Sequence, residues 1–150
     1  MLKEYLIDKK CIDIKYPAAD WQSAVRRGCE LLERAGAVSD AYYEAILENV
    51  RKNGPYFVLI PGFAMPHAAP SAESGVRTVG FSLVTLQNPV SFGHESNDPV
   101  DVLIGVCAPN RDEFNEQAMV EVMELIDDEP RMERLRAAED RNQAFDALAR

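Results

Sequence analysis

Apolar residues recur three or four positions apart in several parts of the chain, which is the spacing of amphipathic helices. The first such part begins after Asp20, which suits an N-cap, and ends before Gly36, which suits the position after a helix. A second part ends at Asn53, and a third covers Phe114–Asp127. Pro130 can open a short fourth helix, and a fifth lies near the end of the sequence. The pattern therefore predicts two helices in the first third of the chain and three in the last.

Strand patterns occupy much of the rest. Lys10–Ile14 alternates over a short stretch, Tyr56–Ile60 is a continuous apolar run, and Val90–Phe92 fits a short strand. Arg77–Leu86 and Val100–Val106 also alternate, and the latter is apolar on its other face too, as a central strand is. Because strands cluster between groups of helices, we expect an α/β fold: a mixed β-sheet sandwiched by α-helices, in one domain over residues 1–150.

Composition places the chain among soluble proteins. Its 150 residues are 47% hydrophobic, but no apolar run reaches the roughly 20 residues that cross a bilayer. The first ten residues are too charged for a signal peptide, so we expect a cytoplasmic protein without membrane insertion. The net charge of −9 argues against binding to nucleic acid, which requires a cationic surface.

The cysteines and histidines show no metal-binding spacing. Cys11, Cys29 and Cys107 are far apart and form no CxxC pair, so we interpret them as buried thiols in a reducing compartment. His67 and His94 are the two histidines of the chain, and neither belongs to an HxH or HExxH pattern. We therefore expect no metal site.

His67 is the strongest candidate for chemistry. It stands between Pro66 and the nearby Pro70, beyond an apolar run and a Pro-Gly break, so it belongs to a stiff loop. A histidine with an ordinary pKa of about 6.5 is largely neutral in the cytoplasm, and the neutral ring is a nucleophile. These residues alone also fit a histidine that only stabilises a turn, and both interpretations stay open at this point.

A family resemblance favours the chemical interpretation. Residues 62–67 read Gly-Phe-Ala-Met-Pro-His, which resembles the Gly-x-[Ala/Ser]-[Ile/Met/Val]-Pro-His signature of mannitol- and fructose-type enzyme IIA proteins. The longer stretches 54–70 and 92–100 are more similar to the ascorbate-type branch of that family. The resemblance extends from the helix after Asp20 to the helices after Pro130.

The resemblance implies a phosphocarrier of the bacterial sugar phosphotransferase system. His67 would take a phosphoryl group from the phosphohistidine of HPr and pass it to a cysteine of enzyme IIB, which phosphorylates a sugar or sugar acid entering through enzyme IIC. This activity requires no metal and no cofactor, and the sequence has no Gly-rich ATP-binding loop. Phe63, Met65 and Ala68 lie around His67 in the sequence, and we expect them to form an exposed apolar rim. HPr and enzyme IIB, the partners that the resemblance implies, would dock on this rim in turn.

Supporting residues are less well defined by the sequence. Mannitol-type members carry a second histidine where this chain has Phe114 or Asn115, and an arginine where it has Arg51. Asn115 could donate a hydrogen bond to phosphate, and Arg51 could form an ion pair with it. His94 could assist if its turn folds beside His67, or it could serve only that turn. Ascorbate-type members often have arginine where this chain has Ala69.

Two other functions fit the same sequence. One is a regulatory enzyme IIA relative that signals through its phosphorylation state. The other is a non-catalytic binding module in which His67 is structural. The formation of a homo-oligomer is left open as well.

Overall fold

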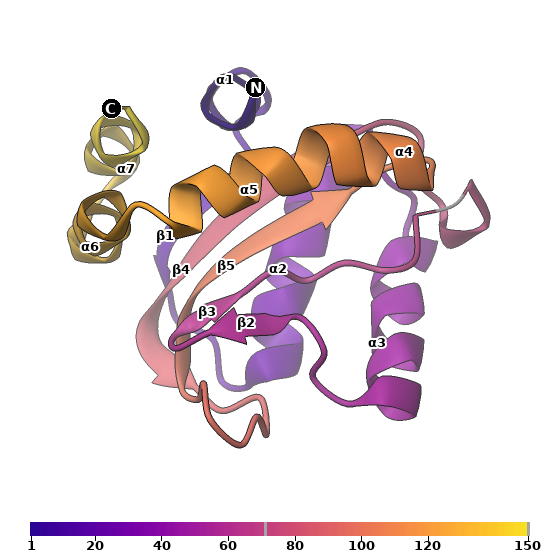
Figure 1. The fold of residues 1–150 in the computed structure, drawn as a ribbon, viewed down its shortest axis with the longest axis horizontal. Helices are drawn as coiled ribbons and strands as arrows, with labels where there is room; N and C mark the ends of the chain where they lie inside the picture. The colour runs from indigo at the N-terminus through magenta and orange to yellow at the C-terminus, as the bar shows by residue number, and fades with distance from the viewer. Residues whose placement is uncertain (71, 150) are drawn as a thin grey trace.

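A mixed β-sheet forms the centre of the molecule (Figure 1). The computed structural model describes residues 1–70 and 72–149. Across these residues the strand order is β1-β4-β5-β3-β2. The β4–β5 and β2–β3 pairs are antiparallel, whereas β1 runs parallel to β4 and β3 runs parallel to β5. The strands are β1 (Ile12–Tyr16), β2 (Val58–Ile60), β3 (Phe63–Ala64), β4 (Gly80–Val90) and β5 (Val100–Cys107).

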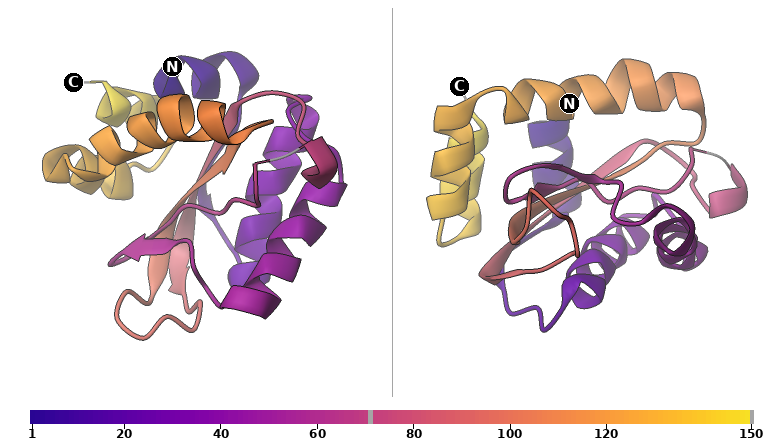
Figure 2. Two further views of the ribbon diagram at one scale, coloured as in Figure 1. Left: turned by 45° about the vertical axis from the view of Figure 1, so that its right-hand side comes forward. Right: turned by 60° about the horizontal axis from the view of Figure 1, so that its bottom comes forward.

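Helices cover both faces of this sheet, which confirms the predicted α/β sandwich (Figures 1 and 2). On one face lie α2 (Trp21–Arg34) and α3 (Ala41–Asn53). The other face is crossed by one continuous helical stretch made of α4 (Arg111–Glu113), the π-helical η2 (Phe114–Ala118) and α5 (Met119–Ile126). The remaining helical elements are α1 (Leu2–Lys9), the 3₁₀ turn η1 (Ala72–Ser74), α6 (Glu129–Ala137) and α7 (Arg141–Leu148).

Helix α2 packs closely on the sheet because both the helix and the sheet have a glycine where they meet. The helix begins at the predicted cap, where the Asp20 carboxylate accepts a hydrogen bond from the Ser23 amide. A Cβ atom added at Gly28 of α2 would lie 3.0 Å from Ser82 Oγ, and one added at Gly105 of β5 would lie 2.4 Å from it. The Ser82 hydroxyl therefore occupies the space that side chains at these two positions would need.

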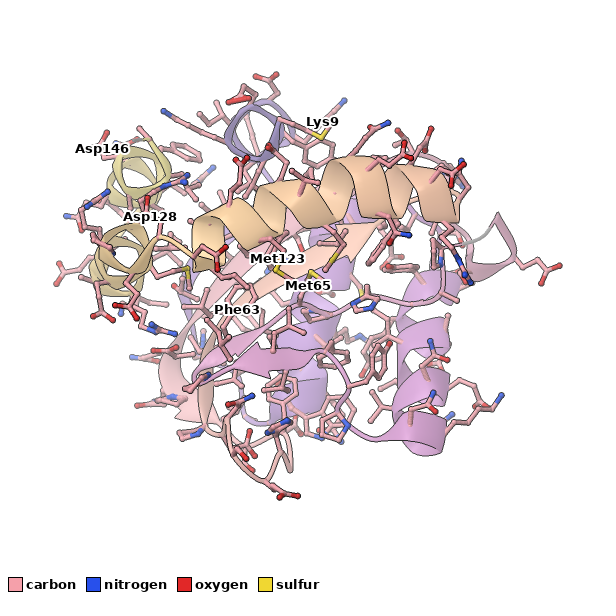
Figure 3. All side chains as sticks on the ribbon, in the orientation of Figure 1. Lys9, Phe63, Met65, Met123, Asp128 and Asp146 are labelled. Carbon is pink, nitrogen blue, oxygen red and sulfur yellow. The ribbon has the colours of Figure 1, made fainter. Side chains whose placement is uncertain are left out.

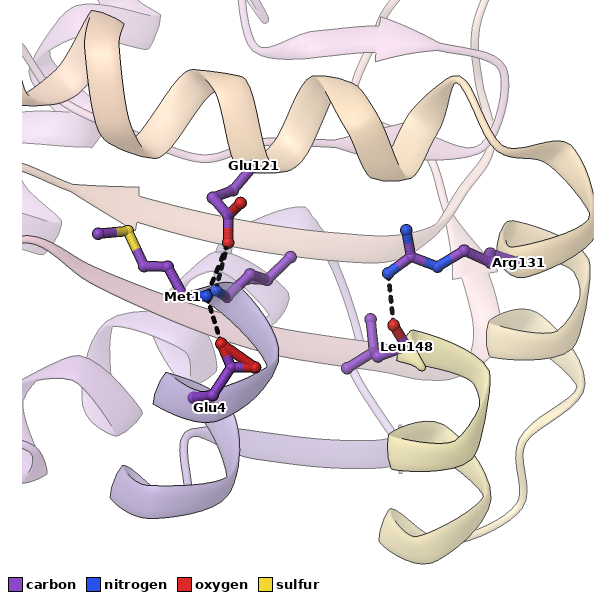
Figure 4. A network of polar contacts seen from close by, with 6 residues as sticks. Met1, Glu4, Glu121, Arg131 and Leu148 are labelled. Carbon is purple, nitrogen blue, oxygen red and sulfur yellow. Dashed lines mark hydrogen bonds and ion pairs between the residues drawn. The ribbon is translucent and has the colours of Figure 1, made fainter. Parts of the chain in front are cut away.

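Polar contacts join α1 to α5 and α6 to α7 (Figure 4). The Met1 amine forms ion pairs with Glu4 and with Glu121 of α5, the latter at 3.1 Å. Nη2 of the buried Arg131 donates to the Leu148 carbonyl at 2.5 Å, which ties α6 to the end of α7. None of the helices in the described ranges combines the length and the hydropathy that spanning a bilayer requires.

Some predicted element boundaries were wrong. Val90–Phe92 is not a separate strand, because β4 continues across an irregular register to Val90, which pairs with Val100. Helix α1 was not predicted, since only Leu2 and Leu6 of its eight residues are buried. Strand β3 was also missed, because two residues are too few to show an alternating pattern.

Candidate functional site

The loop that carries His67 leaves the sheet at the end of β3. Its backbone is bonded to strands on both sides: the Met65 amide donates to the Phe57 carbonyl at 2.8 Å, and the Val106 amide donates to the Pro66 carbonyl at 3.0 Å. Pro66 is buried, whereas His67 is half-buried. The prolyl ring and these two bonds therefore fix the direction in which the imidazole leaves the backbone.

A buried tyrosine from α3 fixes the other side of the loop. The Tyr42 hydroxyl donates to the Val106 carbonyl at 2.5 Å and accepts from the Ala68 amide at 3.1 Å. Tyr42 is 1% exposed, so both backbone groups depend on this one hydroxyl for a partner away from water. The residues before and after His67 are thus attached to the sheet.

The ring of His67 is held in one tautomer. Its Nδ1 lies 2.7 Å from the Met65 carbonyl oxygen, and because a carbonyl only accepts, Nδ1 carries the proton. Nε2 then presents a lone pair, and it forms no hydrogen bond with the described residues. Burial lowers the pKa of His67, and the bond to Met65 offsets this effect in part. The ring is consequently neutral and nucleophilic over a wider pH range than a free histidine.

Two aromatic rings pack against the imidazole. The centroid of the Phe114 ring lies 5.1 Å from that of His67, and the Tyr56 ring meets His67 edge-on at 5.2 Å. The Tyr56 hydroxyl donates to the His67 carbonyl, and Asn49 of α3 lines the same pocket. Burial raises the pKa of Tyr56, so its hydroxyl remains a donor. These contacts hold the ring in place without occupying Nε2.

An open pocket of about 370 Å³ adjoins the imidazole. It offers hydrogen-bond donors and one permanent positive charge, that of Arg111 at the start of α4. A small anion beside Nε2 would therefore find both space and donors. The described residues include no group of three His, Cys, Asp or Glu side chains that could hold a metal ion. The residues that line the pocket are Asn49, Tyr56, His67, Ala69, Pro70, Arg111, Phe114 and Asn115.

Of the predicted supporting residues, Asn115 is brought to His67 and Arg51 is not. Phe114 and Asn115 lie in the π-turn, where the first packs on the imidazole and the second lines the pocket. Arg51 is exposed and pairs with Glu48 at 3.1 Å. Asn49 faces the pocket, and a residue two positions further along a helix points to nearly the opposite side. The position of Arg51 therefore does not support the predicted contact with phosphate.

His94 also lies outside the pocket. Its Nδ1 accepts from the amides of Ser96 and Asn97 at 3.1 and 3.0 Å, and its own amide donates to Asp98. The ring thus closes the turn that precedes β5, which is the second of the two alternatives considered for His94. A short polar segment can satisfy itself in this way without any ligand.

The predicted apolar rim is wrong. Phe63, Met65 and Ala68 are at most 2% exposed. Figure 3 shows Phe63 and Met65 beneath helix α5. Exposed apolar side chains are found instead on α5, where Val120 and Met123 are 47% and 37% exposed. The residues around His67 show no regular alternation of apolar and polar positions. The sequence therefore did not indicate which of their side chains face the core.

Arg111, Asn49 and Tyr42 were not predicted as site residues. The sheet explains why Arg111 reaches the pocket: β3 and β5 are parallel neighbours, so the segments that follow them leave the sheet at the same end. His67 follows the first strand and Arg111 follows the second. A prediction of that parallel pairing would have identified Arg111 as a site residue. Nothing in the sequence near Asn49 or Tyr42 indicates that these α3 residues lie close to His67.

Comparisons with known proteins give consistent matches over nearly the whole chain. The family model described as phosphoenolpyruvate-dependent sugar phosphotransferase system, EIIA 2, matches residues 5–150. The ascorbate-specific PTS system EIIA component of Shigella boydii serotype 4 is 43% identical over 149 residues, covering 99% of this chain and 96% of that protein.

Two solved structures share the fold. The mannitol-specific cryptic phosphotransferase enzyme IIA CmtB from Escherichia coli superimposes with a TM-score of 0.83 and 32% identity, covering 99% of this chain and 97% of that one. Enzyme IIAMtl from Escherichia coli, in its complex with phosphorylated enzyme IIBMtl, has a TM-score of 0.80 and 26% identity, with coverage of 93% and 94%. The fold, the full-length match and the identity all lead to one conclusion: this chain belongs to the EIIA 2 family of the phosphoenolpyruvate-dependent sugar phosphotransferase system, and is a phosphocarrier component of it.

Proposed function

We propose that Nε2 of His67 is the atom that carries the phosphoryl group. The observation behind this proposal is the state of the imidazole: Nδ1 is occupied by the Met65 carbonyl, Nε2 lacks a hydrogen bond within the described chain, and His67 lines an open pocket. A neutral nitrogen that is already oriented needs little reorganisation before it attacks phosphorus.

The phosphoryl donor in this proposal is the phosphohistidine of HPr. The lone pair of Nε2 forms a new P–N bond, the P–N bond to the donor breaks, and its electron pair remains on the donor imidazole. The proton on Nδ1 does not have to leave, because the Met65 carbonyl stabilises the positive charge that develops on the ring. Transfer between two imidazoles leaves the bond type unchanged and is therefore readily reversible.

The acceptor in this proposal is a cysteine thiolate of enzyme IIB. Its sulfur forms a P–S bond as the P–Nε2 bond breaks, and the imidazole of His67 returns to its neutral form. Support comes from the related enzyme IIAMtl, whose solved complex contains phosphorylated enzyme IIBMtl. Exposed Val120 and Met123 on α5 provide apolar surface for a transient interface of this kind.

Asn115 is proposed to donate a hydrogen bond to the phosphoryl group. It lines the pocket from the π-turn, and its amide offers two N–H donors. A neutral amide can orient phosphoryl oxygens but cannot balance their charge.

The transported compound is proposed to be ascorbate or a similar sugar acid, imported through enzyme IIB and enzyme IIC. This assignment rests on the ascorbate-specific relatives, which match nearly the whole chain. A cytoplasmic location belongs to the same proposal, and the free, buried Cys11, Cys29 and Cys107 are compatible with a reducing compartment.

The test is phosphorylation with purified components. The protein is incubated with phosphoenolpyruvate, enzyme I and HPr, and the phosphorylated residue is located by mass spectrometry. We expect one acid-labile phosphate on His67, none on His67→Gln, and normal labelling of His94→Gln, the matched control. Labelling that persists in His67→Gln would assign the phosphate to another residue and end the proposal.

A further inference from the structure

We propose that Arg111 binds the phosphoryl oxygens on His67 and supplies the positive charge that the transferred group requires. This inference rests on the function proposed above. It adds a second functional residue, from a different strand end and a different helix, and it identifies the ligand of that residue as a phosphoryl dianion.

The guanidinium of Arg111 is free to bind an anion. The side chain is exposed, lines the pocket beside His67, and forms no ion pair or hydrogen bond with the described residues. Two other arginines are engaged: Arg27 binds Asp13 at 2.7 Å, and Arg136 binds Asp101 at 2.9 Å. A carboxylate bound to Arg111 would compete with phosphate, and none in the described chain does so.

The charge balance of the pocket requires a cation. The protein carries a net charge of −9, which opposes the arrival of a doubly negative group. Phe114 covers the imidazole with an apolar ring, while Asn49, Tyr56 and Asn115 are neutral. Arg111 is therefore the charged group among the described residues that line the pocket.

Arginine suits this role chemically. Its planar guanidinium can donate two parallel N–H bonds to the oxygens of one phosphoryl group and keeps its charge at any physiological pH. Charge that develops on those oxygens during transfer is stabilised most by a donor already in place. Because parallel β3 and β5 deliver His67 and Arg111 to the same end of the sheet, their relative position depends on the most rigid part of the fold.

The test compares charge-removing and charge-keeping variants. Single-turnover phosphorylation by phospho-HPr is measured for wild type, Arg111→Gln, Arg111→Lys and the matched control Arg134→Gln, which removes an exposed arginine from α6. We expect Arg111→Gln to slow transfer roughly ten- to a hundredfold, Arg111→Lys to recover part of the rate, and Arg134→Gln to match wild type.

A second measurement separates contact with the phosphoryl group from docking of the donor protein. In phosphorylated protein, a nearby cation favours the dianion, so the ³¹P resonance of wild type should titrate at lower pH than that of Arg111→Gln, by roughly half a pH unit or more. An unchanged ³¹P midpoint, with a loss confined to the KM for phospho-HPr, would overturn the inference. If wild type itself gains no phosphate, the proposed function fails instead.

Discussion

The phenyl ring of Phe114 lies against the imidazole of His67, with 5.1 Å between ring centroids and 42° between ring planes. Phe114 is the first residue of the π-turn that interrupts the helical stretch over the sheet. Such turns are often found at functional sites, because the extra residue redirects the side chains that follow. Here the turn places an apolar ring against His67, and both residues line the open pocket.

Removing that ring should change the ionisation of His67. In Phe114→Ala water reaches the imidazole, so the pKa of His67 should rise toward the ordinary value of about 6.5, as followed by NMR titration. The same change should destabilise the protein by about 3 kcal/mol. Phe114→Leu keeps most of the packing and separates the two effects. A titration midpoint that is the same in all three proteins would show that Phe114 does not desolvate the ring.

The rate of phosphoryl acceptance should depend on pH through His67. Burial lowers its pKa, so the neutral ring persists below the pH at which a free histidine becomes protonated. We expect transfer from phospho-HPr to stay constant as pH falls through about 6.5, and to decline only at lower pH. A decline centred on 6.5 or above would contradict this, provided that the donor is shown to remain active over the range.

The free energy of unfolding should also depend on pH because the pKa of His67 is lowered in the folded protein. Below about pH 6.5 the unfolded chain binds a proton at His67 that the folded protein does not bind. The free energy of unfolding therefore decreases as the pH is lowered, until the pKa of His67 in the folded protein is reached. Replacement by glutamine removes this group in both states. The stability of wild type relative to His67→Gln should therefore decrease between about pH 7.5 and pH 5.5 in denaturant titrations, and a constant difference would be inconsistent with a lowered pKa.

Arg51→Ala and His94→Gln should transfer phosphate at rates within about twofold of wild type, since neither side chain lines the pocket. Arg51 was predicted as a supporting group from the family resemblance, so its variant also tests how far that resemblance extends. His94 was a candidate because its turn could have folded beside His67. A tenfold loss in either variant would mean that the residue reaches the phosphoryl group in the complex with a partner protein.

The Tyr42 hydroxyl should be important for stability. Tyr42→Phe leaves the Ala68 amide and the Val106 carbonyl buried without their partner, which should cost about 1–3 kcal/mol. The matched control is Tyr43→Phe, whose half-exposed hydroxyl forms one 3.4 Å bond to the Gln22 carbonyl. The control should change stability by less than about 0.5 kcal/mol. Equal effects in the two variants would show that the bridge does not stabilise the loop.

The sequence predicted those parts of the fold in which a pattern repeats. Helix α2 was predicted with its Asp20 cap and its glycine terminus, and Val100–Val106 was correctly interpreted as a central strand. Elements with only two inward-facing or two paired residues, namely α1 and β3, give no repeat to detect.

The sequence indicated His67 as the candidate residue and gave less indication of the residues around it. Two prolines and a local signature mark that histidine, and these are features of consecutive residues. Its neighbours Tyr42 and Arg111 arrive from α3 and from the end of β5, so their proximity depends on strand pairing rather than on spacing. Arg51 and His94 have side chains that could bind phosphate, but both are engaged elsewhere. Arg51 pairs with Glu48, and the His94 ring closes a local turn.

The attachment of the His67 loop to the sheet has a consequence for the order of events in the phosphorelay. Because Pro66 and Ala68 are both bonded to β5 or to the tyrosine that bridges it, the proposed acceptor nitrogen of His67 should have the same orientation whichever partner protein approaches. Donor and recipient must then use one overlapping footprint and cannot be bound together. The turnover rate of the carrier would accordingly depend on how quickly one partner protein dissociates, so that the other can bind.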